Sequence, residues 1–212
     1  MKLVELSVEE FLNQIDGPTP APGGGSVSAL AISQGISLLR MVAHLTISKK
    51  KFQSVSDKIK LDYMSRMTAL DELKKQANEL IERDTQAFNK IMDAYKMPKE
   101  AAEIRKLAIE KATIEATEIP LSTAKLAYKA LELAFPMFDL ANKTATSDYG
   151  VGVLLIDAGL KGAILNVKTN MQGFENRDLA NNYFHSVQEL EQKAKVFVEK
   201  LLKDVNDCLN LK

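Results

Sequence analysis

The sequence predicts an all-α protein, a layered bundle of about seven helices, several of them long. Apolar residues recur at helical spacing in almost every segment after Gly25. No segment alternates apolar and polar residues in the way that a half-buried strand does. The composition does not break along the chain and we find no internal repeat, so we expect residues 1–212 to form a single helical domain.

The first two helices are predicted from their capping residues. Ser7 and Glu10 have the spacing of a capping box, which opens a short first helix. Ser26 offers a side-chain oxygen to cap a second helix that runs to about Ile47. A basic patch follows at residues 49–51, and the next helical pattern is a long one, at about residues 55–95.

Prolines mark the starts of the next two predicted helices. Pro98 and Pro120 both precede segments with helical periodicity, and proline fits the first turn of a helix. We therefore expect one helix from Pro98 to about Ala116 and a separate helix from Pro120 to about Leu133. After a polar loop, two more helices are predicted at about residues 148–169 and 178–209.

Composition narrows the class of protein. Hydrophobic residues make up 46% of the chain, enough for a sizeable core, and 28 basic residues balance 28 acidic ones, which argues against nucleic acid as a partner. The single Cys208 cannot form an internal disulfide, and no secretion signal opens the chain, so we expect a cytoplasmic protein. The uncharged stretch 17–39 is too rich in proline, glycine and polar residues to span a membrane, and we expect no membrane partner.

The stretch GPTPAPGGGSVSALAISQG, residues 17–35, is the most unusual local feature. Its prolines stiffen the approach to a glycine triplet, Gly23, Gly24 and Gly25, which allows very close approach to the backbone. The first amides of the following helix would then form an anion site supported by the helix dipole. A tight turn between two helices or two subunits is the other interpretation. No Gly-Lys-Ser/Thr follows, which excludes a P-loop.

Asp84 interrupts an apolar helix face. Along the predicted long helix, apolar residues recur at steps of three and four, and Asp84 occupies one of these positions; the others are Ala77, Ile81, Phe88, Ile91 and Tyr95. Desolvation there would raise the pKa of the carboxyl group, which suits a general acid or base near neutral pH. The alternatives are a buried ion pair with a Lys or Arg, or a face rotated toward solvent.

A stripe of small and polar residues runs along the helix after Asp148. Glycines in its middle allow the close approach of a helix or a flat ligand, and polar groups lie at either end: Asp148, Gly152, Leu155, Gly159, Gly162, Asn166 and Asn170. The alternatives are an N-cap role for Asp148, plain helix packing for the glycines, and a solvated face for the two asparagines.

Other candidate residues carry weaker signals. His44 and His185 belong to no metal-ligand spacing, and we expect no metal. Cys208 has no evident base beside it and is expected to be inert. The basic patch at residues 49–51 is either a solvated turn or a carboxylate-binding group at the mouth of a cleft.

These motifs together resemble the cyclodeaminase/cyclohydrolase family, the all-helical folate domain of formiminotransferase-cyclodeaminases and stand-alone methenyltetrahydrofolate cyclohydrolases. The likeness begins in the run from Pro18 to Leu30. It continues through Met41-Val42-Ala43-His44-Leu45-Thr46, Lys49-Lys50, Asp84-Thr85-Gln86-Ala87-Phe88, Lys96-Met97-Pro98-Lys99, Asn142, Ser147-Asp148, Asn166-Val167 and Asn170. The sequence departs from the usual family pattern at the extra Ala21-Pro22, at His44, at Ser48 and at Ala141.

The resemblance implies a homodimer that acts on a tetrahydrofolate derivative, either as a formiminotetrahydrofolate cyclodeaminase or as a methenyltetrahydrofolate cyclohydrolase, with no other cofactor. It implies an essential aspartate at Asp84, which would shuttle a proton, and a folate site near the glycine turn. The expected substrate contacts are Gly23, Gly24, Gly25, Ser26, Lys49, Lys50, Asn142, Asp148 and Asn170. Asp148 would orient the pterin or polarise a water, and the two lysines would meet the glutamate carboxylates of the folate tail.

Two other functions fit the same pattern. One is a helical folate-binding or interaction module that has the fold and lacks turnover. The other is a cyclase-like enzyme that acts on a different nitrogen heterocycle.

Overall fold

The structure, a computed structural model, describes residues 1–210, and within this range it contains helices and no strand. The α-helices are α1 (Val8–Ile15), α2 (Gly24–Ile47), α3 (Lys50–Gln53), α4 (Asp57–Lys96), α5 (Ala102–Ala134), α6 (Thr146–Met171) and α7 (Arg177–Asn210). Short 3-10 helices are η1 (Leu3–Glu5), η2 (Phe135–Leu140) and η3 (Lys143–Ala145). The prediction of an all-α fold is confirmed.

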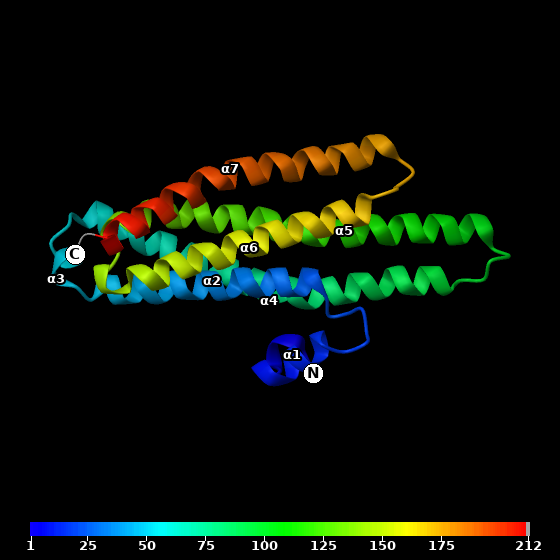
Figure 1. The fold of residues 1–212 in the computed structure, drawn as a ribbon, viewed down its shortest axis with the longest axis horizontal. Coiled ribbons are helices and arrows are strands. Elements are labelled where there is room, and N and C mark those ends of the chain that lie inside the picture. The colour runs from blue at the N-terminus through cyan, green and yellow to red at the C-terminus, as the bar shows by residue number, and fades with distance from the viewer. Residues whose placement is uncertain (211–212) are drawn as a thin grey trace.

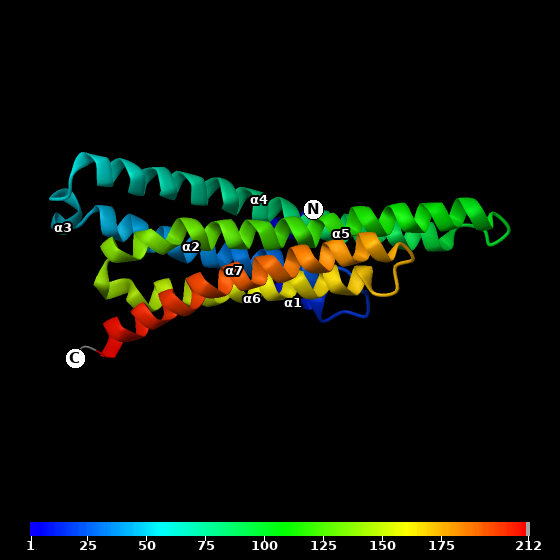
Figure 2. The ribbon, with the colours of Figure 1, turned by 90° about the horizontal axis from the view of Figure 1, so that it is seen from above.

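The five long helices run side by side along one axis and give an elongated molecule (Figures 1 and 2). The hairpin of α4 and α5 extends furthest at one end, while α2 begins only part way along the bundle (Figure 1). The short α1 lies outside the bundle next to the first part of α2. As predicted, Ser7 and Glu10 form the capping box of α1.

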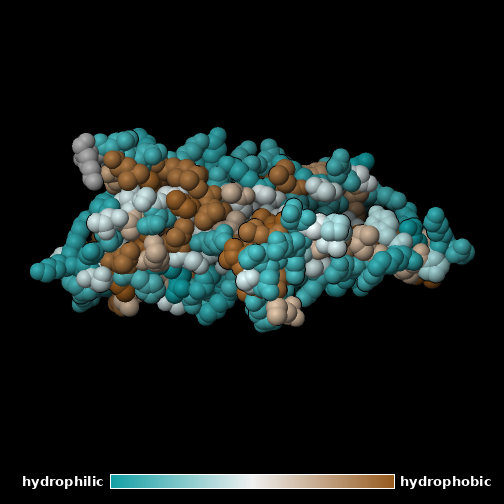
Figure 3. Space-filling model, turned by 60° about the horizontal axis from the view of Figure 1, so that its bottom comes forward, coloured by the Kyte–Doolittle hydropathy of each residue, from teal (hydrophilic) through white to brown (hydrophobic). Residues whose placement is uncertain are grey.

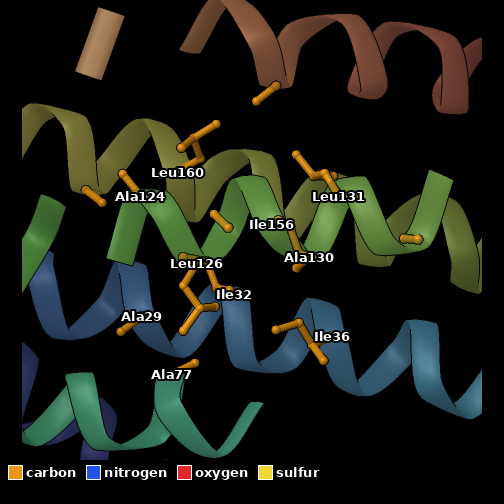
Figure 4. Packing of buried hydrophobic residues seen from close by; sticks show 14 of the residues in the cluster. Ala29, Ile32, Ile36, Ala77, Ala124, Leu126, Ala130, Leu131, Ile156 and Leu160 are labelled. Carbon is orange, nitrogen blue, oxygen red and sulfur yellow. The ribbon is translucent and has the colours of Figure 1, made fainter. Parts of the chain in front are cut away.

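The core lies between α2, α4, α5 and α6. Figure 4 shows their apolar side chains gathered in this space, among them Ile32, Ile36, Leu126 and Ile156. All four are buried, and α6 and α7 enclose a further layer of apolar residues. The helices are therefore held mainly by burial of their apolar faces.

Glycines bring α2 and α6 into backbone contact. A Cβ atom at Gly35 would lie 2.6 Å from the carbonyl oxygen of Gly152, and one at Gly159 would lie 2.6 Å from that of Ser28. Any side chain at these positions would push the helices apart. For the glycines of the α6 stripe, plain helix packing is thus the correct interpretation, and the close packing fixes where the start of α2 lies.

The prediction of a helix boundary at Pro120 is wrong, because α5 continues through it from Ala102 to Ala134. Pro120 has no N–H to donate to the carbonyl of Ala116, which would leave a buried acceptor unsatisfied. The side-chain Nδ2 of Asn170, on α6, donates to this carbonyl over 3.2 Å. A neighbouring helix therefore supplies the hydrogen bond that the proline removes.

Two segments, Gly24–Ile47 and Lys143–Met171, are long and apolar enough to cross a membrane by length and composition alone. In their most apolar windows, 56% and 50% of the residues are buried inside the bundle, as expected for core helices. Other apolar residues of these helices are partly or largely exposed, and this exposed apolar surface is considered below.

Candidate active site

The side chain of Asp84, a residue of α4, lies against the start of α2, where Ser26 holds it. The backbone N–H of Ser26 donates to Asp84 Oδ2 over 2.9 Å, and the Ser26 hydroxyl lies 3.2 Å from the same oxygen. The hydroxyl also lies 2.8 Å from the carbonyl oxygen of Ile81, one turn earlier on α4. The predicted apolar face of α4 thus does carry a half-buried carboxyl group, and it meets the glycine turn.

The start of α2 differs from the prediction in a way that matters for ligand binding. The helix begins at Gly24 with Gly23 as its N-cap, so Ser26 is the third helical residue rather than the cap. Asp84 instead caps the helix from α4 by accepting the Ser26 amide. The protein's own carboxylate therefore occupies the expected anion site, and the N–H of Ser26 is not free to bind a ligand.

Gly25 is required by this arrangement. A Cβ atom at Gly25 would overlap both carboxyl oxygens of Asp84. At Gly24 the nearest neighbour of such an atom would be Asn166 Nδ2, at 3.4 Å, which is an ordinary contact. Of the two glycines, Gly25 is the one that lets the carboxyl group reach the backbone of α2.

Burial sets the protonation behaviour of Asp84. Desolvation raises the pKa of this carboxyl group, and the hydrogen bonds from the amide and hydroxyl of Ser26 oppose the rise, leaving the pKa above its ordinary value. Within residues 1–210, no Lys or Arg forms an ion pair with Asp84. The alternative of a buried ion pair is therefore wrong, and the carboxyl group is free to pair with a cationic ligand.

Asn166 of α6 completes the wall of the site. It lies beside Gly24, and its Nδ2 donates to the carbonyl of Gly162 over 2.9 Å. Asn170, one turn later, uses its Nδ2 for the carbonyl of Ala116. Neither residue lies on a freely solvated face. Of the two, Asn166 lies closer to the glycine turn. In the sequence, its place on the same stripe as Gly162, four residues earlier, indicated that it faces this region.

The remaining predicted contacts lie at the opposite end of α2. The backbone N–H of Asn142 donates to the hydroxyl of Thr46, near the end of α2, over 2.9 Å. Lys49 and Lys50 follow directly and are exposed. Because 23 residues separate Gly24 from Ile47, this end of the helix lies about 35 Å from the glycine turn at about 1.5 Å of rise per residue.

Asp148 also lies far from the glycine turn. It is the third residue of α6, whose N-cap is Ala145, so the alternative of an N-cap role is wrong. Eighteen residues of the same helix separate Asp148 from Asn166, or about 27 Å. Within one chain, the structure therefore brings Gly23, Gly24, Gly25, Ser26 and Asp84 together and keeps Lys49, Lys50, Asn142 and Asp148 apart from them.

Comparison with known proteins identifies relatives along almost the whole chain. Residues 7–189 match the family model described as formiminotransferase-cyclodeaminase. A methenyltetrahydrofolate cyclohydrolase from Methylorubrum extorquens is 31% identical over 96% of this chain and 98% of its own length. A formimidoyltransferase-cyclodeaminase from Dictyostelium discoideum is also 31% identical, over 94% of this chain, but the match covers only 36% of that longer protein.

A solved structure shares the fold. The crystal structure of formiminotetrahydrofolate cyclodeaminase from Thermotoga maritima superposes with a TM-score of 0.86 at 22% identity. The match covers 98% of this chain and 100% of that one. At this level of identity the likeness concerns the fold.

Proposed function

The chain belongs to the formiminotransferase-cyclodeaminase family, and from this membership we propose that it forms or hydrolyses 5,10-methenyltetrahydrofolate by proton transfer through Asp84. Its named relatives are cyclohydrolases and cyclodeaminases, and it is an enzyme of this folate one-carbon type. The end-to-end match to a stand-alone cyclohydrolase supports the hydrolytic reaction first. We also propose that the enzyme works in the cytoplasm with no cofactor beyond its tetrahydrofolate substrate.

The observation that carries the proposal is a half-buried carboxyl group, with a raised pKa and no cationic partner in the described chain, beside bare backbone. The methenyl carbon of the substrate bridges two nitrogens that share a positive charge. A carboxylate that lacks its own cation suits such a group, because opposite charges attract strongly at a partly desolvated site.

The two oxygens of Asp84 have different surroundings. The backbone N–H of Ser26 donates to Oδ2 and the Ser26 hydroxyl lies 3.2 Å from the same oxygen, which fixes the carboxyl group on the start of α2. Oδ1 lies against Gly25 and accepts no hydrogen bond from the described residues. We therefore assign proton transfer to Oδ1 and orientation to Oδ2.

In the hydrolytic reaction, water attacks the methenyl carbon and Asp84 accepts a proton from it. One bond between this carbon and a ring nitrogen then breaks, and Asp84 returns the proton to that nitrogen. The remaining hydroxyl proton leaves to solvent as the C=O bond forms, and a formyl group stays on the other nitrogen. In the cyclodeaminase reaction, N10 attacks the formimino carbon and loses its proton to Asp84, which passes a proton to the departing ammonia. Both reactions need one carboxyl group that both accepts and donates a proton.

We further propose that the enzyme is a homodimer that pairs through α2. The outward residues of α2 follow steps of four and three, the spacing of a helix–helix seam: Val27, Ala31, Gln34, Leu38, Met41 and Leu45. Val27, Met41 and Leu45 are 37%, 38% and 42% exposed, and Leu154 and Leu165 of α6 are 51% and 63% exposed. Figure 3 views the side on which α1 and α2 lie and shows apolar residues gathered across it.

The residues of the α2 seam are placed symmetrically about Ile36, as contact with a second copy of the same helix requires. Val27 and Leu45 lie equally far along the chain from Ile36, as do Ala31 and Met41, and Gln34 and Leu38. A two-fold axis at the level of Ile36 would pair each residue with its counterpart in an antiparallel partner. The same operation would place Lys49 of the partner subunit beside Gly23, and it would bring Asn142 and Asp148 of the partner subunit to the same end. The dimer thereby joins the two separated groups of residues.

A non-catalytic folate-binding module is the second candidate, and one observation favours it. Asp84 caps α2, which is a structural reason for the residue to be present without any chemistry. An absorbance assay for the methenyl group, run with methenyl- and formimino-tetrahydrofolate, separates the two. Turnover of either substrate supports the enzyme, and binding without turnover of both supports the module.

A further inference from the structure

We propose that the cavity between the tip of the α4–α5 hairpin and the α6–α7 turn binds the glutamate tail of the folate substrate, with Arg105 as its main anchor and Lys99 as a second cation. This inference rests on the proposed function and adds to it a tail-binding site within the same chain. Of the residues that line this cavity, the sequence singled out Lys99 and Asn170 through the family resemblance, but not Arg105.

The tail carboxylates need a site of their own. The anion site expected at the start of α2 already holds the carboxyl group of Asp84. A second carboxylate beside it would meet like-charge repulsion. The predicted tail contacts, Lys49 and Lys50, lie about 35 Å from the glycine turn of the same chain. In the proposed dimer Lys49 of the partner subunit would lie beside Gly23, and the test below distinguishes that cation from Arg105.

The cavity has the size and lining of a ligand site. Its volume is about 540 Å³, within the range of small-molecule pockets. Ile91, Tyr95 and Phe174 give it an apolar wall that suits a benzoyl ring, and Arg105 supplies a cation. Asn170, whose Nδ2 is already bonded, lies at the edge nearest Asn166.

The charges in the cavity leave Arg105 and Lys99 free for a ligand. Lys106 pairs with Glu175 at 2.7 Å, and Glu110, the other acid of the lining, acts electrostatically on Lys106. Within residues 1–210, neither Arg105 nor Lys99 forms an ion pair. The cations without partners therefore outnumber the acids without partners.

The structure holds the guanidinium group of Arg105 in place. Its Nη2 donates to the carbonyl of Tyr95 over 3.1 Å, and its carbon lies 5.7 Å from the centre of the Tyr95 ring. Its Nε is buried and has no acceptor among the described residues, so the donors left for a ligand are those of the two terminal nitrogens. An oriented guanidinium with donors to spare is well suited to bind a carboxylate through two hydrogen bonds.

The cavity lies at the right distance from Asp84. Ile91 follows Asp84 by seven residues on the same face of α4, or about 10 Å along the helix. Arg105 is held further along, at Tyr95, which follows Asp84 by eleven residues, or about 16 Å. From N10 through the benzoyl ring to the γ-carboxylate the substrate spans about 12 Å by its bond lengths, and a hydrogen bond of about 3 Å at each end covers the rest. Figure 1 shows that α4 and α5 extend beyond the point where α2 begins, so the substrate would lie along α4 past the glycine turn.

The test is a comparison of two substrates in parallel, methenyltetrahydrofolate and its analogue without the glutamate, methenyltetrahydropteroate. We expect Arg105→Gln to raise KM for the first about ten-fold or more, as for the loss of a charge-assisted hydrogen bond, and to leave KM for the second and both kcat values unchanged. Lys99→Gln should show a smaller effect of the same kind. Lys111→Gln, which removes a charge from the same helix outside the cavity, should change neither KM.

Three outcomes would overturn the inference: equal KM values for Arg105→Gln and the parent, an equal rise with both substrates, or a tail-specific loss in Lys49→Gln/Lys50→Gln alone. Melting curves check that each variant folds. If Arg105→Gln does not fold, Lys99→Gln is used in its place for the comparison of the two substrates. If the parent turns over no folate, the proposed function fails. Calorimetric titration with p-aminobenzoylglutamate then still tests the cavity, because binding that Arg105→Gln does not weaken contradicts the inference.

Discussion

Ser26 and Asp84, 58 residues apart in the sequence, are joined by a 2.9 Å hydrogen bond from the backbone N–H of the first to Oδ2 of the second. One carboxyl group thereby caps α2 and stands beside the bare backbone of the glycine turn. Because the cap uses Oδ2 alone, the structural role leaves Oδ1 for chemistry. The predictions that follow depend on these separate roles of the two carboxyl oxygens of Asp84.

Gly25→Ala should displace the Asp84 carboxyl group. The added Cβ would overlap its oxygens, and the cost of forcing them apart is about 1–3 kcal/mol. We expect a lower melting temperature and a strong loss of turnover. Gly24→Ala is the matched control for stability, since its Cβ would come only to 3.4 Å from Asn166 Nδ2. Equal melting temperatures for the two variants would contradict the geometry.

The stability of the protein should depend on pH through Asp84. Its pKa in the folded state lies above the ordinary value of 3.8, so between these two values the folded state binds more protons than the unfolded state. The free energy of unfolding therefore falls as pH rises through this window. Compared with Asp84→Asn, the parent should lose relative stability as pH rises above about 4. Melting temperatures of both across pH 3 to 7 measure this, and a constant difference would refute it.

Turnover should have the matching pH dependence. If the Asp84 carboxylate accepts the proton, kcat/KM falls on the acid side as the carboxyl group becomes protonated. Because burial raises its pKa, the midpoint should lie above the ordinary range of aspartate.

Leu45→Glu should separate the proposed dimer. Leu45 is 42% exposed on the α2 seam, and two charges introduced on a two-fold interface would be desolvated without partners. Sedimentation should show a monomer with native helicity and little turnover. Val196→Glu, at a residue of α7 that is 65% exposed, is the control and should leave the assembly unchanged. A monomeric parent would rule out the dimer.

Sequence reasoning located Asp84 because the residue breaks an otherwise apolar pattern on one helix. It missed the continuity of α5, because the hydrogen bond that compensates for Pro120 comes from Asn170 on another helix. It also misjudged the role of Ser26, since the cap of α2 comes from α4. Patterns within one helix could be predicted from the sequence, whereas contacts between helices could not.

The separation of Lys49 and Lys50 from the glycine turn could have been predicted from the sequence. A single helix predicted from Ser26 to Ile47 already placed its two ends more than 30 Å apart, at about 1.5 Å per residue. Arg105 gave no such signal, because a charged residue near a helix start is ordinary. Only its place in the cavity and its lack of an ion-pair partner among the described residues mark it.

Mixing two defective variants tests whether the site is shared between subunits. Asp84→Asn and Asp148→Asn should each have little turnover. In a mixed dimer one site carries both changes and the other carries neither, so random reassociation should restore about a quarter of the parental rate. Co-expression of the two variants provides this mixture, and the mixed dimer purified through a separate tag on each variant should have about half of the parental rate. Activity no higher than that of either variant alone would place both residues in sites made by a single chain.

The rate of Asp84→Asn in the methenyl absorbance assay tests the central claim most directly. The amide keeps the shape of the side chain and an oxygen for the Ser26 cap, so the melting temperature should stay close to that of the parent. It cannot carry the proton, and turnover should fall about 10²- to 10⁴-fold. A folded variant that converts methenyl- or formimino-tetrahydrofolate at close to the parental rate would contradict the account.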